Sequence, residues 1–280
     1  MPVPYFGCKI KLARWITSYF PNHSAYVEPF CGSASVFHTK RRSRSETLND
    51  LYAPLINYHR CLRDDVERLI RTIEARSLTY KLMLPEYNPA SPYNSASEFY
   101  LYCCRSFYGG GTRWATGKRK NPRKLNLNGL RGESLRLQNV SITQLDAIDV
   151  IVSSSDPDTL MYVDPPYRKE VRKSKDNRVK NQVQSQPRRQ YAHELMQSDE
   201  HQRLLAAIVK SNSMLIVSGY DSQLYNDMLD GWMIVRQKAQ KLSGEAEEVL
   251  WISPNAWSRL PKAQQTRRSP KLHQFTLDLS

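Results

Sequence analysis

Four consecutive residues, Asp164-Pro165-Pro166-Tyr167, have the types needed to hold an amino group for reaction. They follow the apolar run 159–163, which is typical of a buried strand in a parallel sheet. Proline has no N–H, so carbonyl oxygens here stay free as acceptors. The Asp164 carboxylate and the Pro165 carbonyl could accept both amine hydrogens and direct the nitrogen lone pair at an incoming methyl group. The ring of Tyr167 could stack on a planar base. The alternative is an ordinary proline-rich strand exit.

A turn of small residues follows another apolar run, at 25–27. In Phe30-Cys31-Gly32-Ser33-Ala34 the small side chains let a ligand approach the backbone closely, near a helix N-terminus. The same turn could also serve packing alone.

Asp50 lies two residues after the next apolar segment, 46–48, and about 20 residues beyond the turn. An acidic side chain at that place can accept hydrogen bonds from ribose hydroxyls. The alternative is an N-cap for a helix that starts at Leu51. Further upstream, Tyr5-Phe6-Gly7-Cys8-Lys9 offers an aromatic face, a tight turn and a cation.

These residues require a scaffold of alternating strands and helices. Strands are expected at 25–27, 46–48, 159–163, 214–217 and 249–252, and helices at 51–73 and 199–209. This alternation predicts an α/β fold with a mostly parallel sheet and helices on both of its faces. The carboxyl edge of such a sheet is where ligands bind, so the turn, Asp50 and Asp164 should meet there.

The domain organisation follows from the stretches in which strands and helices do not alternate. We expect a core domain of residues 1–59 and 136–255, interrupted by a mainly helical insertion at 60–135. Residues 168–190 carry nine Lys or Arg against two acids, which predicts a basic mobile loop. Residues 256–280 are expected to form a polar tail.

The composition narrows the class of partner. The chain has 41 Lys and Arg against 27 Asp and Glu, a net charge of +14, which favours a polyanion such as nucleic acid. We find no apolar run long enough to span a membrane and no signal peptide. The five cysteines lack the spacing of a metal or disulfide motif, so we expect free thiols, no metal and a cytoplasmic location.

Together, the ordered segments from Tyr5 to about 252 resemble the Dam-like family of adenine-specific DNA methyltransferases of bacteria and phages. The resemblance implies a Rossmann-like fold that binds S-adenosyl-L-methionine. It implies that Tyr5, Lys9 and Asp50 help to bind this cofactor, with Phe30 and Gly32 beside it. It also implies that Asp164, near the cofactor, and Tyr167 hold the target adenine.

Asp146 falls where this family has an acidic residue near the adenine of the cofactor, although a surface Asp would fit its position equally well. Two positions depart from the family pattern. Cys8 replaces the second glycine of the family's Gly-Gly-Lys segment, and Ala34 replaces the second glycine of the turn.

The insertion resembles the part of the family that reads the DNA target. Its segment 105–113 is similar to the family's recognition hairpin but lacks the Asn-Gly-Leu pattern of members that read GATC. Arg can read guanine in the major groove, so Arg105 and Arg113 are candidates for base contacts; contacts to phosphates only are the alternative. We expect Lys118, Arg119 and Lys120 to meet DNA phosphates.

The prediction is therefore a methyltransferase that acts on the exocyclic 6-amino group of an adenine flipped out of double-stranded DNA. The mechanism needs no metal and no enzyme nucleophile, and a separate restriction nuclease is not required. Two alternatives stay open at this point. One is methylation of the cytosine 4-amino group, and the other is a catalytically silent DNA-binding protein of the same fold.

Overall fold

The computed structural model describes residues 3–5, 7–79, 81, 83–106, 125–166, 198–241 and 244–266. Within this part of the chain, one sheet has seven strands in the order β3-β2-β1-β4-β5-β7-β6. Their bounds are β1 (Ala25–Glu28), β2 (Ser45–Asn49), β3 (Ser141–Thr143), β4 (Thr159–Val163), β5 (Met214–Gly219), β6 (Met233–Lys241) and β7 (Gly244–Ile252). The first five strands are parallel, while β7 runs antiparallel between β5 and β6. The predicted mostly parallel sheet is confirmed.

The two faces of the sheet each carry a hydrophobic core. Every residue of β4 is buried, and alternate side chains point to opposite faces. Leu160 and Tyr162 belong to one core, whereas Met161 and Val163 belong to the other. A strand buried on both faces explains why this segment is a continuous apolar run.

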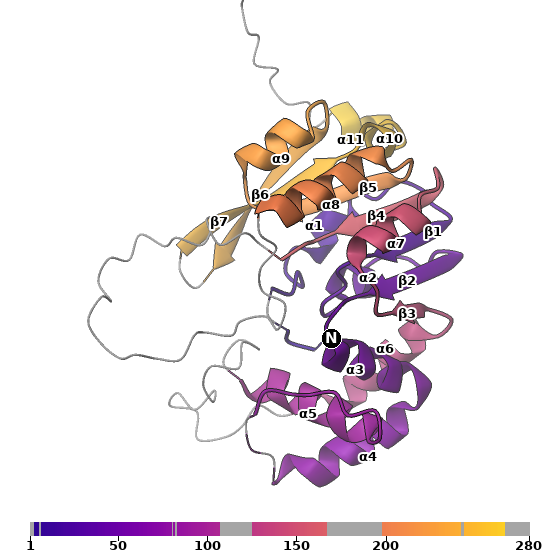
Figure 1. Cartoon of the computed structure of the whole chain (residues 1–280), viewed down its shortest axis with the longest axis vertical. Coiled ribbons are helices and arrows are strands. Elements are labelled where there is room, and N and C mark those ends of the chain that lie inside the picture. Colours follow the sequence, from indigo (N-terminus) through magenta and orange to yellow (C-terminus); the bar gives the residue numbers. More distant parts are fainter. Residues whose placement is uncertain are drawn as a thin grey trace, which may run out of the picture.

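Helices cover both faces, as predicted (Figure 1). One face packs against α7 (Ala147–Ser153), α8 (Ser198–Lys210) and α9 (Gln223–Met228). The other packs against α1 (Ala13–Thr17), α2 (Ser35–Thr39) and α10 (Pro254–Ser258).

Four further helices gather beside β3, in the lower half of Figure 1. They are α3 (Ala53–Asp64), α4 (Val66–Ser77), α5 (Pro92–Arg105) and α6 (Leu127–Leu137). The single helix predicted over 51–73 is wrong, because α3 ends at Asp64 and a new helix begins at Val66. Asp65 has a non-helical ψ of 85° and its carboxylate accepts a hydrogen bond from Arg68 N, so it caps α4. The limits of the insertion at 60–135 stay a prediction.

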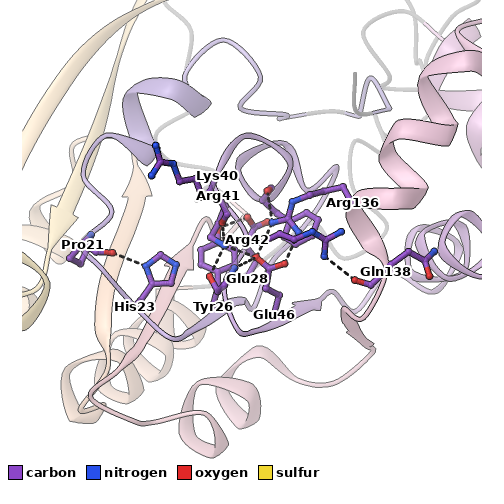
Figure 2. A network of polar contacts seen from close by, with 12 residues as sticks. Pro21, His23, Tyr26, Glu28, Lys40, Arg41, Arg42, Glu46, Arg136 and Gln138 are labelled. Carbon is purple, nitrogen blue, oxygen red and sulfur yellow. Dashed lines mark hydrogen bonds and ion pairs between the residues drawn. The ribbon is translucent and has the colours of Figure 1, made fainter.

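A buried ion network joins α6 to the sheet (Figure 2). Glu46 on β2 pairs with Arg136 of α6 at 2.5 Å and with Lys40, just after α2, at 2.6 Å. The Arg136 guanidinium also lies 3.7 Å from the centroid of the Phe37 ring. The side chain of Glu46 is only 3% exposed, so its charge requires cationic partners, and Lys40 and Arg136 provide them.

Three segments differ from the sequence predictions. The edge strands β3 and β6 were not predicted. Part of the expected polar tail is folded: α10 and α11 (Lys262–Thr266) continue the chain, and Ala256 and Leu260 are buried. Residues 267–280 and the basic segment 168–190 lie outside the described residues.

Candidate active site

The site lies between two neighbouring strands in the middle of the sheet, after which the chain continues in opposite directions. β1 and β4 are neighbours, yet β1 leads on to β2 on one side and β4 leads on to β5 on the other. The loops after these two strands therefore separate and leave a crevice at the carboxyl edge. The turn 30–34 follows β1, and Asp164 follows β4.

A cavity of about 490 Å³ occupies this crevice. The structure brings together around it every predicted cofactor residue and one further predicted catalytic residue: Tyr5, Lys9, Phe30, Gly32, Asp50, Asp146, Asp164 and Pro165. Tyr167 lies outside the described residues.

The turn after β1 is held by two side chains from other elements. Gly32 has a φ of +47°, a conformation that favours glycine. Its N–H donates to Asp50 Oδ2 at 3.1 Å, and its carbonyl lies 2.8 Å from His59 Nε2 on α3. Ala34, at a position where the Dam-like family has glycine, also has a positive φ, of 53°. This conformation costs an alanine about 1–2 kcal/mol.

Asp50 is not the N-cap of α3. That helix begins at Ala53 and its N-cap is Tyr52, without a side-chain cap. Asp50 Oδ1 instead accepts from Tyr52 N at 3.0 Å, while Oδ2 accepts from the turn. Asp50 thus fixes the turn after β1 and the start of the next loop, and it lines the cavity.

Asp146 lies at the surface and at the rim of the cavity, and its predicted place near the adenine of the cofactor stays a prediction. Its side chain is exposed and caps α7 by accepting from Ile148 N at 2.7 Å. It also lines the cavity. The loop that carries it is fixed by Asn49, whose Nδ2 donates to Leu145 O and whose Oδ1 accepts from Leu145 N.

Asp164 uses one carboxylate oxygen for its contacts with described residues. Oδ1 lies 3.0 Å from Lys9 Nζ and accepts from Ser218 Oγ at 2.9 Å. The Ser218 hydroxyl in turn lies 2.8 Å from the Tyr162 hydroxyl. Since Asp164 is at the cavity and its Oδ1 already accepts two donors, Oδ2 can accept a hydrogen bond from a bound amine.

Comparison with known proteins decides the family. The model of the D12 class N6 adenine-specific DNA methyltransferases matches residues 5–241. The chain belongs to this family. This methyltransferase therefore modifies the N6 amine of adenine in DNA, and the cytosine alternative is not supported.

Two other comparisons add little. No curated protein matches the methyltransferase. Among solved structures, a precorrin 8W decarboxylase of Methanobacterium thermoautotrophicum aligns with 87% of this chain and 89% of its own. Its identity is 12% and its TM-score 0.36, which is too low to support an argument.

Burial and neighbouring charges set the ionisation of two groups at the cavity. Burial alone would lower the pKa of Lys9, but the Asp164 and Glu248 carboxylates raise it above its ordinary value. Burial raises the pKa of Glu28 to about 8, despite hydrogen bonds from the Tyr26 hydroxyl and the Phe37 N–H. Lys9 is therefore a cation, and Glu28 is mostly protonated at neutral pH.

Of the residues predicted to contact DNA, only Arg105 lies in the part of the chain that the structure describes. Arg105, the last residue of α5, donates from its guanidinium to the carbonyl of Ser77 and is half-buried. Its role in DNA binding stays a prediction. Arg113, Lys118, Arg119 and Lys120 lie outside the described residues.

The sequence analysis missed several residues of the site, among them Glu28, His59, Ser218 and Glu248. Glu28 directly precedes Pro29 at the end of the first predicted strand, so its position was a usable signal. The others come from elements that carry no motif. Among the described residues, no group of His, Cys, Asp and Glu could hold a metal ion, and no helix is long and apolar enough to cross a membrane.

Proposed function

We propose that this methyltransferase takes its methyl group from S-adenosyl-L-methionine bound in the cavity between β1 and β4. The volume of about 490 Å³ is within the range of small-molecule sites. The cavity also offers the chemistry that such a molecule requires. Asp50 can accept from ribose hydroxyls, the turn 30–34 exposes backbone, and Phe30 and Ile148 give apolar walls.

In the proposed reaction, Asp164 and Pro165 position the target amine. Asp164 Oδ2 and the Pro165 carbonyl accept one N–H each, so the lone pair of the nitrogen points into the cavity. The cofactor supplies a methyl group that is already activated, so the protein contributes position and electrostatics. As the amine nitrogen gains positive charge, the Asp164 carboxylate would stabilise it, and the surplus proton of the methylated nitrogen would then be lost to solvent.

The substrate is expected to be double-stranded DNA with the target adenine flipped out, because the amine is otherwise paired. Tyr167 would stack on the flipped base. The basic segments 113–124 and 168–190 would meet the phosphate backbone. A separate nuclease is compatible with this proposal but not required by it.

The observation that carries the proposal is the convergence of the predicted cofactor residues on one cavity. Calorimetric titration with S-adenosyl-L-methionine tests it. Asp50→Ala should weaken binding at least about tenfold, because charged hydrogen bonds contribute about 1.5–3 kcal/mol. Asp149→Ala, which removes an exposed acid of α7 away from the cavity lining, should bind like the wild type. Equal affinity in both variants, with circular dichroism showing folded protein, would contradict the site.

A further inference from the structure

A buried serine hydroxyl contacts the Asp164 carboxylate. Ser218, on β5, is fully buried, and its Oγ lies 2.9 Å from Asp164 Oδ1 and 2.8 Å from the Tyr162 hydroxyl. A carboxylate can only accept hydrogen bonds, and a hydroxyl has one hydrogen to donate. Ser218 therefore donates to Asp164, and the Tyr162 hydroxyl donates to Ser218. The result is a chain of two hydrogen bonds that runs from Tyr162 to Asp164.

The sheet brings these three groups onto one face. β4 and β5 are parallel neighbours, and Val163 lies opposite Val217. Side chains alternate along a strand, so the residues on either side of Val163, which are Tyr162 and Asp164, share a face with Ser218. Tyr162 is buried in the hydrophobic core of that face. The chain of hydrogen bonds therefore starts from a side chain that the core holds in place.

The composition of β5 sets Ser218 apart. Every residue of this strand is buried, and the hydroxyl of Ser218 is its one polar side-chain group. A buried hydroxyl is unfavourable unless it is hydrogen-bonded, and an apolar residue of similar size would fill the same space. The contribution that the hydroxyl adds at this place is its pair of hydrogen bonds, to Tyr162 and to Asp164.

The two partners of Asp164 Oδ1 differ in what they can fix. Lys9 Nζ lies 3.0 Å away, but an ammonium is a compact charge at the end of a flexible side chain. The Ser218 hydroxyl is one carbon from the backbone of a buried strand, and its bond to Tyr162 fixes where its hydrogen points. Ser218 therefore restricts the rotation of the Asp164 carboxylate, and with it the direction that Oδ2 faces.

Resting on the proposed function, in which Asp164 holds the target amine, we infer that Ser218 is a positioning residue for methyl transfer and that Tyr162 acts through Ser218. Transfer requires the lone pair of the nitrogen to point at the methyl group. A displacement of about 1 Å can slow such a reaction about a hundredfold. Ser218 does not act on the amine itself, because it works through the carboxylate that accepts the amine hydrogen.

The test separates positioning from binding. We would measure single-turnover methyl transfer to unmethylated double-stranded DNA at saturating S-adenosyl-L-methionine, and the Kd of this cofactor by calorimetry. Ser218→Ala should lower the transfer rate at least about tenfold and change Kd less than about twofold, because it frees the orientation of Asp164 and leaves the cavity wall intact. Ser218→Thr keeps the hydroxyl and should recover most of the rate.

A second serine gives the matched control. Ser213 directly precedes β5 and is 2% exposed, and its hydroxyl bonds to backbone carbonyls of Ser154 and Asp156. Ser213→Ala therefore removes a buried hydroxyl at the other end of the same strand. It should leave the transfer rate of the folded protein unchanged, even if it lowers stability.

A double variant tests the chain of hydrogen bonds. Tyr162→Phe removes the hydroxyl that orients Ser218, so it should lower the rate by a smaller factor than Ser218→Ala. Because Tyr162 acts through Ser218, Tyr162→Phe should have no further effect in a protein that already carries Ser218→Ala. Independent structural roles would instead make the two factors multiply.

Three results would overturn the inference. They are a full rate in folded Ser218→Ala, equal losses of rate and of cofactor affinity in that variant, and multiplied effects in the double variant. Should Ser218→Ala fail to fold, an unchanged rate in Tyr162→Phe would overturn it. Full activity of Asp164→Ala would contradict the proposed function itself, whatever the Ser218 variants show.

Discussion

Asp164 illustrates how a single carboxylate can serve two purposes. Its Oδ1 accepts from Ser218 and pairs with Lys9, which fixes the orientation of the group. The other oxygen can then meet a target amine at a defined place. Such preorganisation is the main contribution that the protein can make when the methyl group is already activated.

At the same scale, the buried carboxyl group of Glu28 should make the stability of the folded protein depend on pH. Its pKa is raised by burial from an ordinary value of 4.5 to about 8, so the folded protein keeps a proton that the unfolded chain loses. This residue therefore reduces stability increasingly as pH rises from about 4.5 to 8. Glu28→Gln, measured without ligand, should gain stability relative to the wild type by about 3 kcal/mol more at pH 8 than at pH 5.

Urea unfolding at the two pH values would measure this gain. Glu247→Gln is the control, because its side chain is about half exposed. A difference between Glu28→Gln and the wild type that does not change with pH would contradict the protonation of Glu28.

At the scale of elements, the sequence predicted the strands and turns that are marked by a local pattern of residues. The segments of β1 and β4 are apolar runs, because buried parallel strands must be apolar on both faces. The turn 30–34 and Asp50 could then be placed at the carboxyl edge. In contrast, β6 contains Gln237 and Lys238, and it is formed by pairing with β7 as a hairpin rather than by an apolar run.

The ion pairs that Lys9 makes with Asp164 and Glu248 were beyond prediction for a related reason. The paired residues lie on segments far apart in the sequence and meet only through the order of the strands. Glu248 also stands between Glu247 and Val249, where an acidic residue would ordinarily face solvent. Which residue of a strand faces inward depends on the register, and only the folded sheet fixes that.

The network that joins α6 to the sheet gives a prediction about elements (Figure 2). Arg136→Met would leave Glu46, buried on β2, with only one of its two cations. We expect a loss of about 2 kcal/mol in the free energy of unfolding, the scale of hydrogen bonds to a charged group, because Lys40 still compensates the carboxylate. Arg131→Met on the same helix removes an exposed pair with Glu67 and should cost less than about 1 kcal/mol. Equal losses in the two variants would show that the buried network does not hold α6.

Acid should weaken the same network. Although burial opposes it, hydrogen bonds from Arg136 and Lys40 lower the pKa of Glu46 to about 2. The contribution of this carboxylate to stability is present above its ordinary pKa of 4.5 and is lost as pH falls towards 2. The loss caused by Arg136→Met should therefore shrink in unfolding experiments as pH is lowered from 5 to 3. A loss that stays constant over this range would contradict the pairing.

At the scale of the whole molecule, charge is divided between surface and cavity. The chain carries +14, yet the cavity is lined by more acids than bases.

The excess of positive charge predicts strong salt dependence of DNA binding. The logarithm of the association constant should fall linearly with the logarithm of salt concentration, with a slope of about −0.9 for each phosphate contact. We expect a slope of about −3 or steeper in fluorescence anisotropy with duplex DNA. Deletion of residues 168–190, with its net charge of +7, should make the slope shallower. An unchanged slope would show that this segment does not contact phosphates.

The most direct test of the central claim is transfer of a labelled methyl group. Purified protein would be incubated with unmethylated double-stranded DNA and S-adenosyl-L-methionine labelled in its methyl group, and the DNA digested to nucleosides. The account predicts label on the 6-amino group of adenine with the wild type, and none with Asp164→Ala, which should still bind DNA. Full activity of Asp164→Ala, or a wild type that binds cofactor and DNA but transfers no label, would contradict it.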